Sequence, residues 1–346
     1  MFRPSPDTFD DHTAGPPLAT SEVTVTVAPD SAPMISQSAT PIIDVRGLVK
    51  RYGTLAAVDG VDLQVREHEI FGILGPNGAG KTTTLEIIEG LREPDAGVIT
   101  IAGIDVVDNP AAVKRVIGVQ LQTTAMFDRL SARELIRLFA ALSDGDASRQ
   151  RADELIALVS LQEKADSYAN QLSGGQRQRL SIALALVNDP AVVFLDEPTT
   201  GLDPQARRNL WDLISDLRAS GKTVVLTTHY MEEADVLCDR VAVMDHGQII
   251  ACDTPLNLIQ PPAVVATIQA RLSRPMDPAT IGELPGAFEV TTQGDQLAVK
   301  TNDVQQTLGG LLQRAAELDF RLDNLATTQA TLEDVFLTLT GRSLRE

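Results

Sequence analysis

A glycine-rich segment, residues 75–83, contains the residue types that bind phosphate groups. It follows an apolar run at 70–74 and precedes a sequence with helical character. Glycines allow successive backbone amides to turn toward one anion, and the start of a helix adds its positive end. In the pattern G-x-x-x-x-G-K-T, Lys81 is expected to reach the β- and γ-phosphates of a nucleotide, and Thr82 to bind Mg²⁺. The predicted nucleotide-binding residues of this segment are Gly75, Pro76, Asn77, Gly78, Ala79, Gly80, Lys81, Thr82 and Thr83.

Two adjacent acids, Asp196 and Glu197, stand at the end of a second apolar run, residues 191–195. This run has the composition of a buried strand, and ligands of parallel sheets bind at the carboxyl ends of the strands. We therefore predict that Asp196 binds Mg²⁺ and that Glu197 polarises the attacking water. Taken alone, the acid pair is equally well a solvated turn, and the glycine-rich segment is also compatible with a turn that matches by chance. Their combination favours a site that hydrolyses a nucleoside triphosphate.

A third segment, residues 172–176, places a serine and two glycines at the start of a predicted helix. Such a segment could bind an anion through its backbone amides, although it contains no lysine. By itself such a segment is more often an ordinary capped helix start. Ser173 lies 23 residues before Asp196, and this position favours a functional interpretation.

In their order and spacing, these motifs resemble those of the nucleotide-binding subunits of ATP-binding-cassette (ABC) transporters, over about residues 42–258. In that family, the LSGGQ signature closes on ATP held by the phosphate loop of a second subunit. The resemblance implies a homodimer, or a dimer with a related cassette, with two nucleotides between the subunits. It assigns the signature to Leu172, Ser173, Gly174, Gly175 and Gln176.

The resemblance also assigns four further residues. Gln122 corresponds to the Q-loop glutamine that contacts Mg²⁺ and senses the membrane partner, with Gln120 as a rival for this role. Asp203 corresponds to the D-loop acid at the subunit interface, and His229 to the switch histidine that contacts the γ-phosphate. Tyr52 matches the aromatic residue that stacks on adenine, although a tyrosine packed at a strand end is the alternative. The implied catalytic set is Glu197, His229, Lys81 and Gln122, and the implied Mg²⁺ ligands are Thr82, Gln122 and Asp196.

Two stretches, residues 229–235 and 331–344, resemble the daunorubicin-resistance type of ATP-binding protein. Members of that group energise ABC-2-type exporters of drugs, antibiotics or lipids, whose permease is a separate chain. The resemblance implies a permease contact at residues 122–127, with Met126 and Phe127 as apolar anchors. The alternative is that Phe127 packs locally against the helix that begins near Ser131.

The elements that must position these motifs form an α/β pattern from residue 42 onward, as in a P-loop NTPase. A capping box at Ser131 and Glu134 begins a predicted helical subdomain at about residues 123–171, inserted between strand-rich halves. Residues 1–40 show little apolar periodicity and are predicted to form a disordered tail. The nucleotide-binding domain is expected to occupy residues 41–258.

After Pro261 and Pro262 the composition changes, and a second domain is predicted over residues 262–346. Strands are expected near 266–272, 288–292, 297–301 and 320–325, with helices near 278–283 and after Asp303. This β-α-β-β-α-β order predicts a small α+β domain of the ferredoxin-like, split βαβ type. A final helix is expected at residues 331–339, and no catalytic cluster is recognisable in this domain.

The charge, cysteine content and apolar runs of the chain exclude several classes of protein. The chain has 47 acidic and 29 basic side chains, a net charge of −18, which disfavours broad nucleic-acid binding. Cys238 and Cys252 suit neither a disulfide scaffold nor a zinc site, and no apolar run approaches the length of a membrane span. His246 matches no motif and is expected at the surface or in a turn. We expect a cytoplasmic ATPase held at the inner face of the membrane by its permease; the alternative is a soluble ABC ATPase that acts as a regulator or on nucleic acid or ribosomes.

Overall fold

The computed structural model describes residues 41–121, 126–259, 266–329 and 331–340. We refer to residues 41–259 as the larger part of the chain and to residues 266–329 as the smaller part. The tail predicted at residues 1–40 lies outside the described residues, as does the predicted magnesium ligand Gln122.

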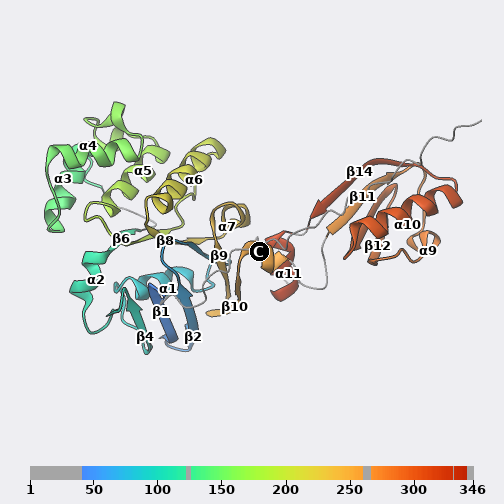
Figure 1. The fold of residues 1–346 in the computed structure, drawn as a ribbon, viewed down its shortest axis with the longest axis horizontal. Coiled ribbons are helices and arrows are strands. Elements are labelled where there is room, and N and C mark those ends of the chain that lie inside the picture. Colours follow the sequence, from blue (N-terminus) through green and yellow to red (C-terminus); the bar gives the residue numbers. More distant parts are fainter. Residues whose placement is uncertain (1–40, 122–125, 260–265, 330, 341–346) are drawn as a thin grey trace, which may run out of the picture. The chain divides into compact units, whose positions relative to one another are not determined.

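The larger part is built on a six-stranded sheet with the strand order β10-β9-β3-β8-β7-β6 (Figure 1). All neighbouring strands are parallel except β9 and β10, which form a hairpin. The central strands are buried along their whole length, as expected for parallel strands that are covered on both faces. The six strands are β3 (Ile70–Leu74), β6 (Ile117–Gln120), β7 (Val192–Asp196), β8 (Thr223–Thr228), β9 (Arg240–Asp245) and β10 (Gln248–Asp253).

A second, antiparallel sheet has the order β2-β1-β4-β5. Helix α1 (Lys81–Ile88) contacts β2 of this sheet as well as β7 and β8 of the six-stranded sheet, so that it joins the two layers. Buried side chains of α1 and of both sheets form one apolar cluster around Phe71 and Ile87. The strands of the second sheet are β1 (Ile43–Tyr52), β2 (Leu55–Val65), β4 (Ala96–Ile101) and β5 (Ile104–Asp105).

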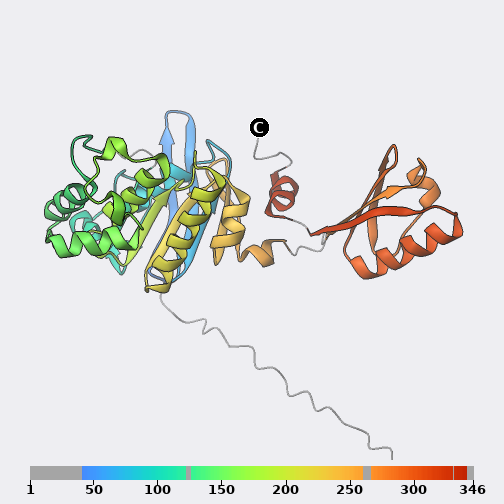
Figure 2. The ribbon, with the colours of Figure 1, turned by 90° about the horizontal axis from the view of Figure 1, so that it is seen from above.

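Helices cover the opposite side of the six-stranded sheet, and three of them pack on one another as a helical group (Figures 1 and 2). This group contains α3 (Ala132–Leu142), α4 (Arg149–Leu158) and α5 (Gly174–Ala185). The capping box predicted for α3 is confirmed, since Ser131 N donates to Glu134 Oε2 (2.8 Å) and Glu134 N donates to Ser131 Oγ (3.3 Å). The remaining elements of the larger part are α2 (Pro110–Val116), η1 (Gln162–Lys164), η2 (Ala169–Gln171), α6 (Pro204–Ala219), α7 (Met231–Leu237) and α8 (Pro255–Ile259).

The smaller part is a four-stranded antiparallel sheet of order β12-β13-β11-β14 with two helices. The β-α-β-β-α-β succession and this strand order confirm the predicted split βαβ fold. Asp303 caps the second helix as predicted, because its Oδ1 accepts from Gln306 N (2.9 Å), whereas the last strand extends four residues beyond its predicted end. The elements are β11 (Ala266–Leu272), α9 (Pro278–Ile281), β12 (Ala287–Gln293), β13 (Gln296–Thr301), α10 (Val304–Glu317) and β14 (Leu322–Gln329).

The last helix, α11 (Leu332–Thr340), packs against α7 and α8 of the larger part. Its buried residues Leu332 and Phe336 belong to the same apolar cluster as Leu237 and Leu258. This helix follows the four-stranded sheet in the sequence, but its apolar contacts are with elements of the larger part. Within the described ranges, no helix combines the length and the apolar character that crossing a membrane requires.

Candidate active site

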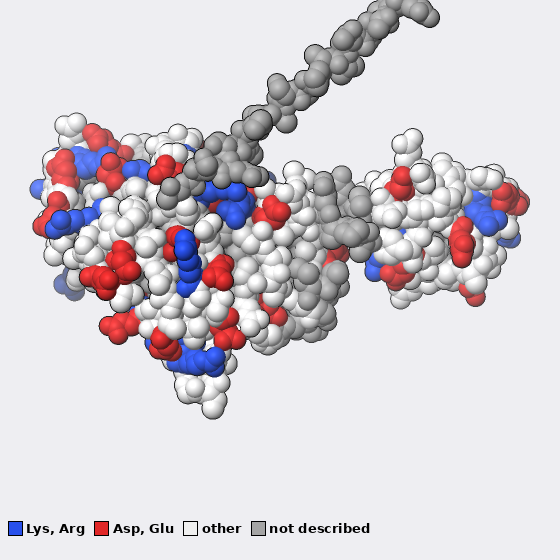
Figure 3. All heavy atoms as spheres, turned by 60° about the horizontal axis from the view of Figure 1, so that its bottom comes forward, with Lys and Arg blue, Asp and Glu red and all other residues white. Residues whose placement is uncertain are grey.

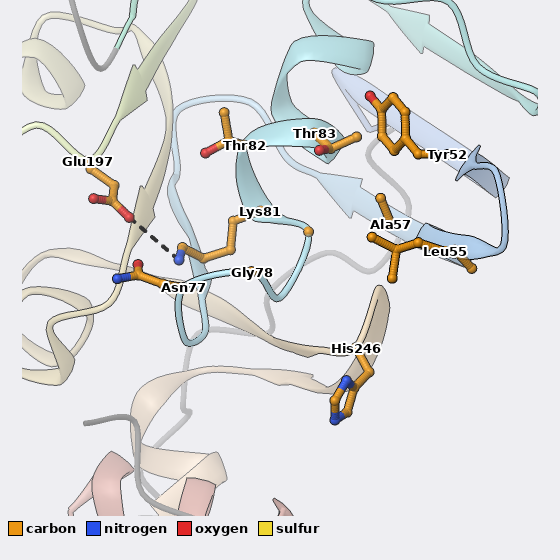
Figure 4. A pocket seen from close by; sticks show the side chains of 12 residues that line it. Tyr52, Leu55, Ala57, Asn77, Gly78, Lys81, Thr82, Thr83, Glu197 and His246 are labelled. Carbon is orange, nitrogen blue, oxygen red and sulfur yellow. Dashed lines mark ion pairs between the residues drawn. The ribbon is translucent and has the colours of Figure 1, made fainter. Parts of the chain in front are cut away.

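A pocket of about 530 Å³ lies where the glycine-rich segment meets three other parts of the larger part. These are the turn between β1 and β2, the end of β7 and the turn between β9 and β10 (Figure 4). The carboxyl end of the parallel strand β7 therefore faces the phosphate loop, as the sequence predicted. The residues that line the pocket are Tyr52, Leu55, Ala56, Ala57, Asn77, Gly78, Gly80, Lys81, Thr82, Thr83, Glu197 and His246.

The glycine-rich segment leads directly from the buried strand β3 into α1. Gly80 stands at the N-cap of α1 with φ +103°, and a β-carbon there would collide with the carbonyl oxygen of Ala57. Within the described part of the chain no side chain caps this helix, so its first amides are available to an anion in the pocket. The loop thus has the conformation that phosphate binding requires.

Lys81 is held in place from two sides. Its Nζ donates to the carbonyl oxygens of Gly75 (2.9 Å) and Pro76 (3.1 Å) and lies 3.5 Å from Oε1 of Glu197. Burial lowers the pKa of Lys81, and the nearby charge of Glu197 opposes this shift. Gly75 and Pro76 do not line the pocket. Their carbonyl groups nevertheless orient the ammonium group of Lys81.

Asp196, at the end of β7, lies beside Thr82 at the start of α1. Thr82 Oγ1 donates to Asp196 Oδ1 (3.3 Å), and Thr227 Oγ1 donates to the same oxygen. Burial raises the pKa of Asp196, and the adjacent Glu197 adds to this effect. A hydroxyl and a carboxylate are oxygen donors of the kind Mg²⁺ prefers, and a cation here would offset the cost of burying the charge.

Glu197 has an unusual backbone conformation, φ +45°, which is rare for a residue with a side chain. The backbone is held by Glu197 N, which donates to Thr227 Oγ1 (3.0 Å), while Thr200 Oγ1 donates to the carboxylate Oε2 (3.1 Å). His229 Nδ1 lies 3.3 Å from the other carboxylate oxygen, Oε1. One carboxylate oxygen, Oε2, therefore accepts a hydrogen bond from Thr200, and the other, Oε1, lies near the nitrogen atoms of Lys81 and His229.

The charge state of Glu197 follows from this environment. Burial is the largest influence and raises its pKa, but Lys81, His229 and the hydrogen bond from Thr200 together hold the pKa below its usual value. Glu197 is thus ionised at neutral pH and capable of accepting a hydrogen bond from water.

Four residues of the predicted signature, Ser173, Gly174, Gly175 and Gln176, line a second hollow of about 250 Å³ together with Asp203, the predicted D-loop acid. Ser173 caps α5, since its Oγ accepts from Gln176 N (3.3 Å) and its N donates to Gln176 Oε1 (2.9 Å). Among the described residues, the two hollows share no lining residue. The signature of this chain therefore does not contribute to the pocket of its own phosphate loop. The second hollow is lined by Ser173, Gly174, Gly175, Gln176, Arg179, Gly201, Leu202, Asp203, Ala206 and Asn209.

The two glutamine candidates are not separated by the structure. Gln122 lies outside the described residues, so its assignment stays a prediction. Gln120 is buried on β6, where its Nε2 donates to Leu121 O (2.6 Å) and its Oε1 has no hydrogen-bond partner among the described residues.

Sequence reasoning missed the part of the pocket that comes from residues 55–57 and from His246. His246 is exposed and in a turn, as expected, but the turn is tied to the phosphate loop because Gly247 N donates to Ala79 O (2.9 Å). Gly247 has φ +78°, and a β-carbon there would lie 2.9 Å from the carbonyl oxygen of Ala57. The Asp245-His246-Gly247 turn signal is visible in the sequence, but its proximity to the loop is a tertiary contact.

We expect His246→Ala to raise the dissociation constant for ATP about two- to tenfold, as for the loss of one net hydrogen bond, with kcat within about twofold. The side chain lines the pocket away from the carboxylate cluster (Figure 4), so it should affect binding more than chemistry. Fluorescent-nucleotide titration and steady-state kinetics measure the two effects. His246→Gln, which keeps a polar group, is the matched control. An unchanged affinity in His246→Ala would remove this residue from the site.

Comparison with known families agrees with this geometry. The family model described as ABC transporter matches residues 58–200. The Nod factor export ATP-binding protein I of Ralstonia nicotianae is 39% identical over 311 residues, which cover 89% of this chain and 96% of that protein. The daunorubicin resistance ATP-binding protein DrrA3 of Streptomyces coeruleorubidus is 40% identical over 311 residues, which cover 88% of this chain and 97% of that protein.

Solved structures of ABC transporter cassettes are also similar to this chain. The dimeric bacterial ABC transporter cassette MJ0796 superposes with a TM-score of 0.57 at 31% identity, over 61% of this chain and 98% of that one. The dimeric post-hydrolysis state of the same cassette, bound to ADP and phosphate, gives a TM-score of 0.56 with the same coverage. The cassette MJ1267 in its ADP conformation gives 0.57 at 26% identity, over 62% of this chain and 92% of that one.

Proposed function

The chain belongs to the ATP-binding subunits of ABC transporters and is an ATPase, and we propose that it drives export through a separate membrane permease. The observation that carries the catalytic assignment is the row formed by Lys81, Glu197 and His229, with separations of 3.5 Å and 3.3 Å along it. This row lies at the end of β7, beside a phosphate loop whose following helix has no side-chain cap among the described residues.

The reaction is the conversion of ATP and water to ADP and phosphate. We propose that the loop amides and Lys81 bind the phosphates, that Tyr52 stacks on the adenine, and that Glu197 Oε1 orients the attacking water and accepts its hydrogen bond. His229 would contact the γ-phosphate from the other side of Glu197. Thr82 and Asp196, and Gln122 by resemblance, would hold Mg²⁺, which offsets the negative charge that develops on the phosphates.

We propose that two chains form a sandwich, with the signature of each closing on the nucleotide of the other. The separation of the two hollows supports this arrangement, as does the similarity to a dimeric cassette. ATP drives closure only if it binds the closed dimer more tightly than the open one, and contact with the partner's signature supplies that difference. The partner is a second copy of this chain or a related cassette.

The exported substrate is proposed by class from the relatives, whose names refer to daunorubicin resistance and Nod factor export. We propose a drug, an antibiotic or a lipid-like molecule, with the chain at the cytoplasmic face of the membrane. A second class, action on nucleic acid or ribosomes, is not favoured. On the face shown in Figure 3, acidic and basic side chains are interspersed, which is unlike the continuous basic surface that binds a phosphate backbone.

The proposal is tested by purification and transport. The chain should co-purify with a multi-helix permease from detergent-solubilised membranes. In vesicles that contain both proteins, export should require ATP. Recovery of the chain without a permease, together with normal ATP hydrolysis, would leave the ATPase intact and contradict the exporter.

Of the permease contact predicted at residues 122–127, the structure describes only Met126 and Phe127. Met126 is partly buried and packs against the apolar cluster of the helical group, so part of its apolar surface is already covered within the chain. Phe127 is 59% exposed, so the local packing considered for it against the following helix is not extensive. We propose Phe127 as the apolar anchor.

We expect Phe127→Glu to reduce recruitment to permease-containing membranes by about fivefold or more, since a charge would be buried in an apolar contact. ATP hydrolysis by the purified subunit should stay within about twofold. Leu142→Glu on α3, at a site that is 73% exposed, is the matched control and should leave recruitment unchanged. Membrane flotation measures recruitment, and unaltered flotation of Phe127→Glu would exclude this contact.

We propose that residues 41–258 form the nucleotide-binding domain and residues 262–346 an accessory domain. The contacts of α11 with α7 and α8 support a role of the chain's end in the nucleotide-binding domain as well.

A further inference from the structure

The first turn of α6 lies directly beside the signature segment. Asp203 caps this helix through Oδ1, which accepts from Ala206 N (2.8 Å), and both residues line the second hollow. A β-carbon at Gly175 would lie only 3.2 Å from Cβ of Ala206. A ligand or partner subunit that filled this hollow would therefore press on the start of α6.

Arg207, the next residue of α6, points toward the beginning of α7. Its guanidinium carbon lies 4.5 Å from the ring centre of Tyr230, and Nη1 lies 3.9 Å from Glu232 Oε2. Its Nε is buried and has no hydrogen-bond partner within the ranges the structure describes. This partly buried cation thus stacks on the ring and also forms a long ion pair with Glu232.

Tyr230 in turn contacts the switch histidine. The rings of Tyr230 and His229 are tilted by 40° with centres 4.1 Å apart. Tyr230 N donates to Thr228 Oγ1 (2.9 Å), which ties the residue to the end of β8. Because His229 Nδ1 lies 3.3 Å from Glu197 Oε1, this ring pair is one side chain away from the carboxylate.

A separate contact joins α6 and α7 one helical turn further on. Trp211 Nε1 donates to Glu233 Oε1 (3.1 Å), and both side chains are buried. Trp211 is the single tryptophan of the chain, so its fluorescence reports on this packing. The packing of α6 on α7 therefore does not depend on the contact between Arg207 and Tyr230 alone.

We propose that Arg207 is a positioning residue for His229, which it orients by stacking on Tyr230, and that it thereby connects the signature hollow to the hydrolytic carboxylate of the same chain. Each connection in this row is a direct packing contact or a separation below 5 Å. The inference deepens the proposed function and depends on it. A displacement of the first turn of α6 would move the guanidinium, the ring and then the imidazole.

The test compares Arg207→Leu with Arg208→Leu on the same helical turn, where Arg208 is exposed. We expect Arg207→Leu to lower kcat about tenfold, with the KM for ATP within about twofold, because misplacing a group that acts on the transition state affects chemistry rather than ground-state binding. Arg208→Leu should resemble the wild type. The melting temperature and the Trp211 fluorescence of Arg207→Leu should be unchanged, since a leucine removes a buried N–H for which the described residues provide no acceptor.

Tyr230 supplies the rescue and the coupling measurement. Tyr230→Phe keeps the ring and should retain kcat within about twofold, whereas Tyr230→Leu should lose about as much as Arg207→Leu. The double variant Arg207→Leu/Tyr230→Leu should be no worse than either single variant, because both remove the same contact.

Three outcomes would overturn the inference: an unchanged kcat in Arg207→Leu, additive losses in the double variant, or a loss in Tyr230→Phe equal to that in Tyr230→Leu. If Arg207→Leu does not fold, the pair of Tyr230 variants decides the question alone. Failure of the proposed function itself would look different, because the unmodified chain would then show no ATP hydrolysis.

Discussion

A Glu197→Gln variant is expected to bind ATP normally and to lose turnover by about two to four orders of magnitude, which is the usual contribution of a general base. The amide keeps the size of the side chain and its bond from Thr200, but it loses the charge that orients water. Its neighbours Lys81 and His229 stabilise an ionised carboxylate, so this is the form that the substitution removes.

The same variant should accumulate a closed dimer in the presence of ATP and Mg²⁺, because closure occurs and the reaction that reopens the dimer does not. Size-exclusion chromatography with light scattering measures the dimer, and nucleotide titration measures binding. Asp216→Asn, an acid-to-amide change at an exposed position of α6, is the control and should hydrolyse ATP normally. A Glu197→Gln protein that binds ATP but stays monomeric would contradict the sandwich.

A Lys81→Ala variant is expected to weaken ATP binding itself by about ten- to a hundredfold or more, as for the loss of a hydrogen bond from a charged group. The ammonium group is positioned by two backbone carbonyl groups before any nucleotide arrives, so little ordering opposes its interaction with the phosphates. Hydrolysis at ordinary ATP concentrations should fall correspondingly.

The control for Lys81→Ala is Lys222→Ala, because Lys222 pairs with Asp189 outside the pocket. Isothermal titration with a non-hydrolysable ATP analogue separates binding from turnover. If Lys81→Ala bound the analogue with unchanged affinity, the phosphate loop would be wrongly assigned.

The parts of the site that depend on local chemistry could be predicted from the amino-acid sequence. The glycine-rich loop must be followed by a helix start, and the acids Asp196 and Glu197 must stand at the carboxyl end of a buried strand, because these patterns extend over only a few adjacent residues. The same reasoning predicted the caps at Ser131 and Asp303, and the alternation of strands and helices that builds the smaller part. The caps can be recognised in the sequence because the residues that form them are only three positions apart.

Which distant residues contact one another depends on the packing of whole elements. Phe127 and Met126 have the same apolar character in the sequence, but the packing of the helical group leaves Met126 partly buried and Phe127 exposed. His246 enters the pocket because its turn bonds to the loop at Ala79, and Arg207 reaches Tyr230 because α6 and α7 pack side by side. Contacts between residues far apart in the chain depend on how whole elements bury their apolar faces. A short segment of sequence does not specify which elements pack together.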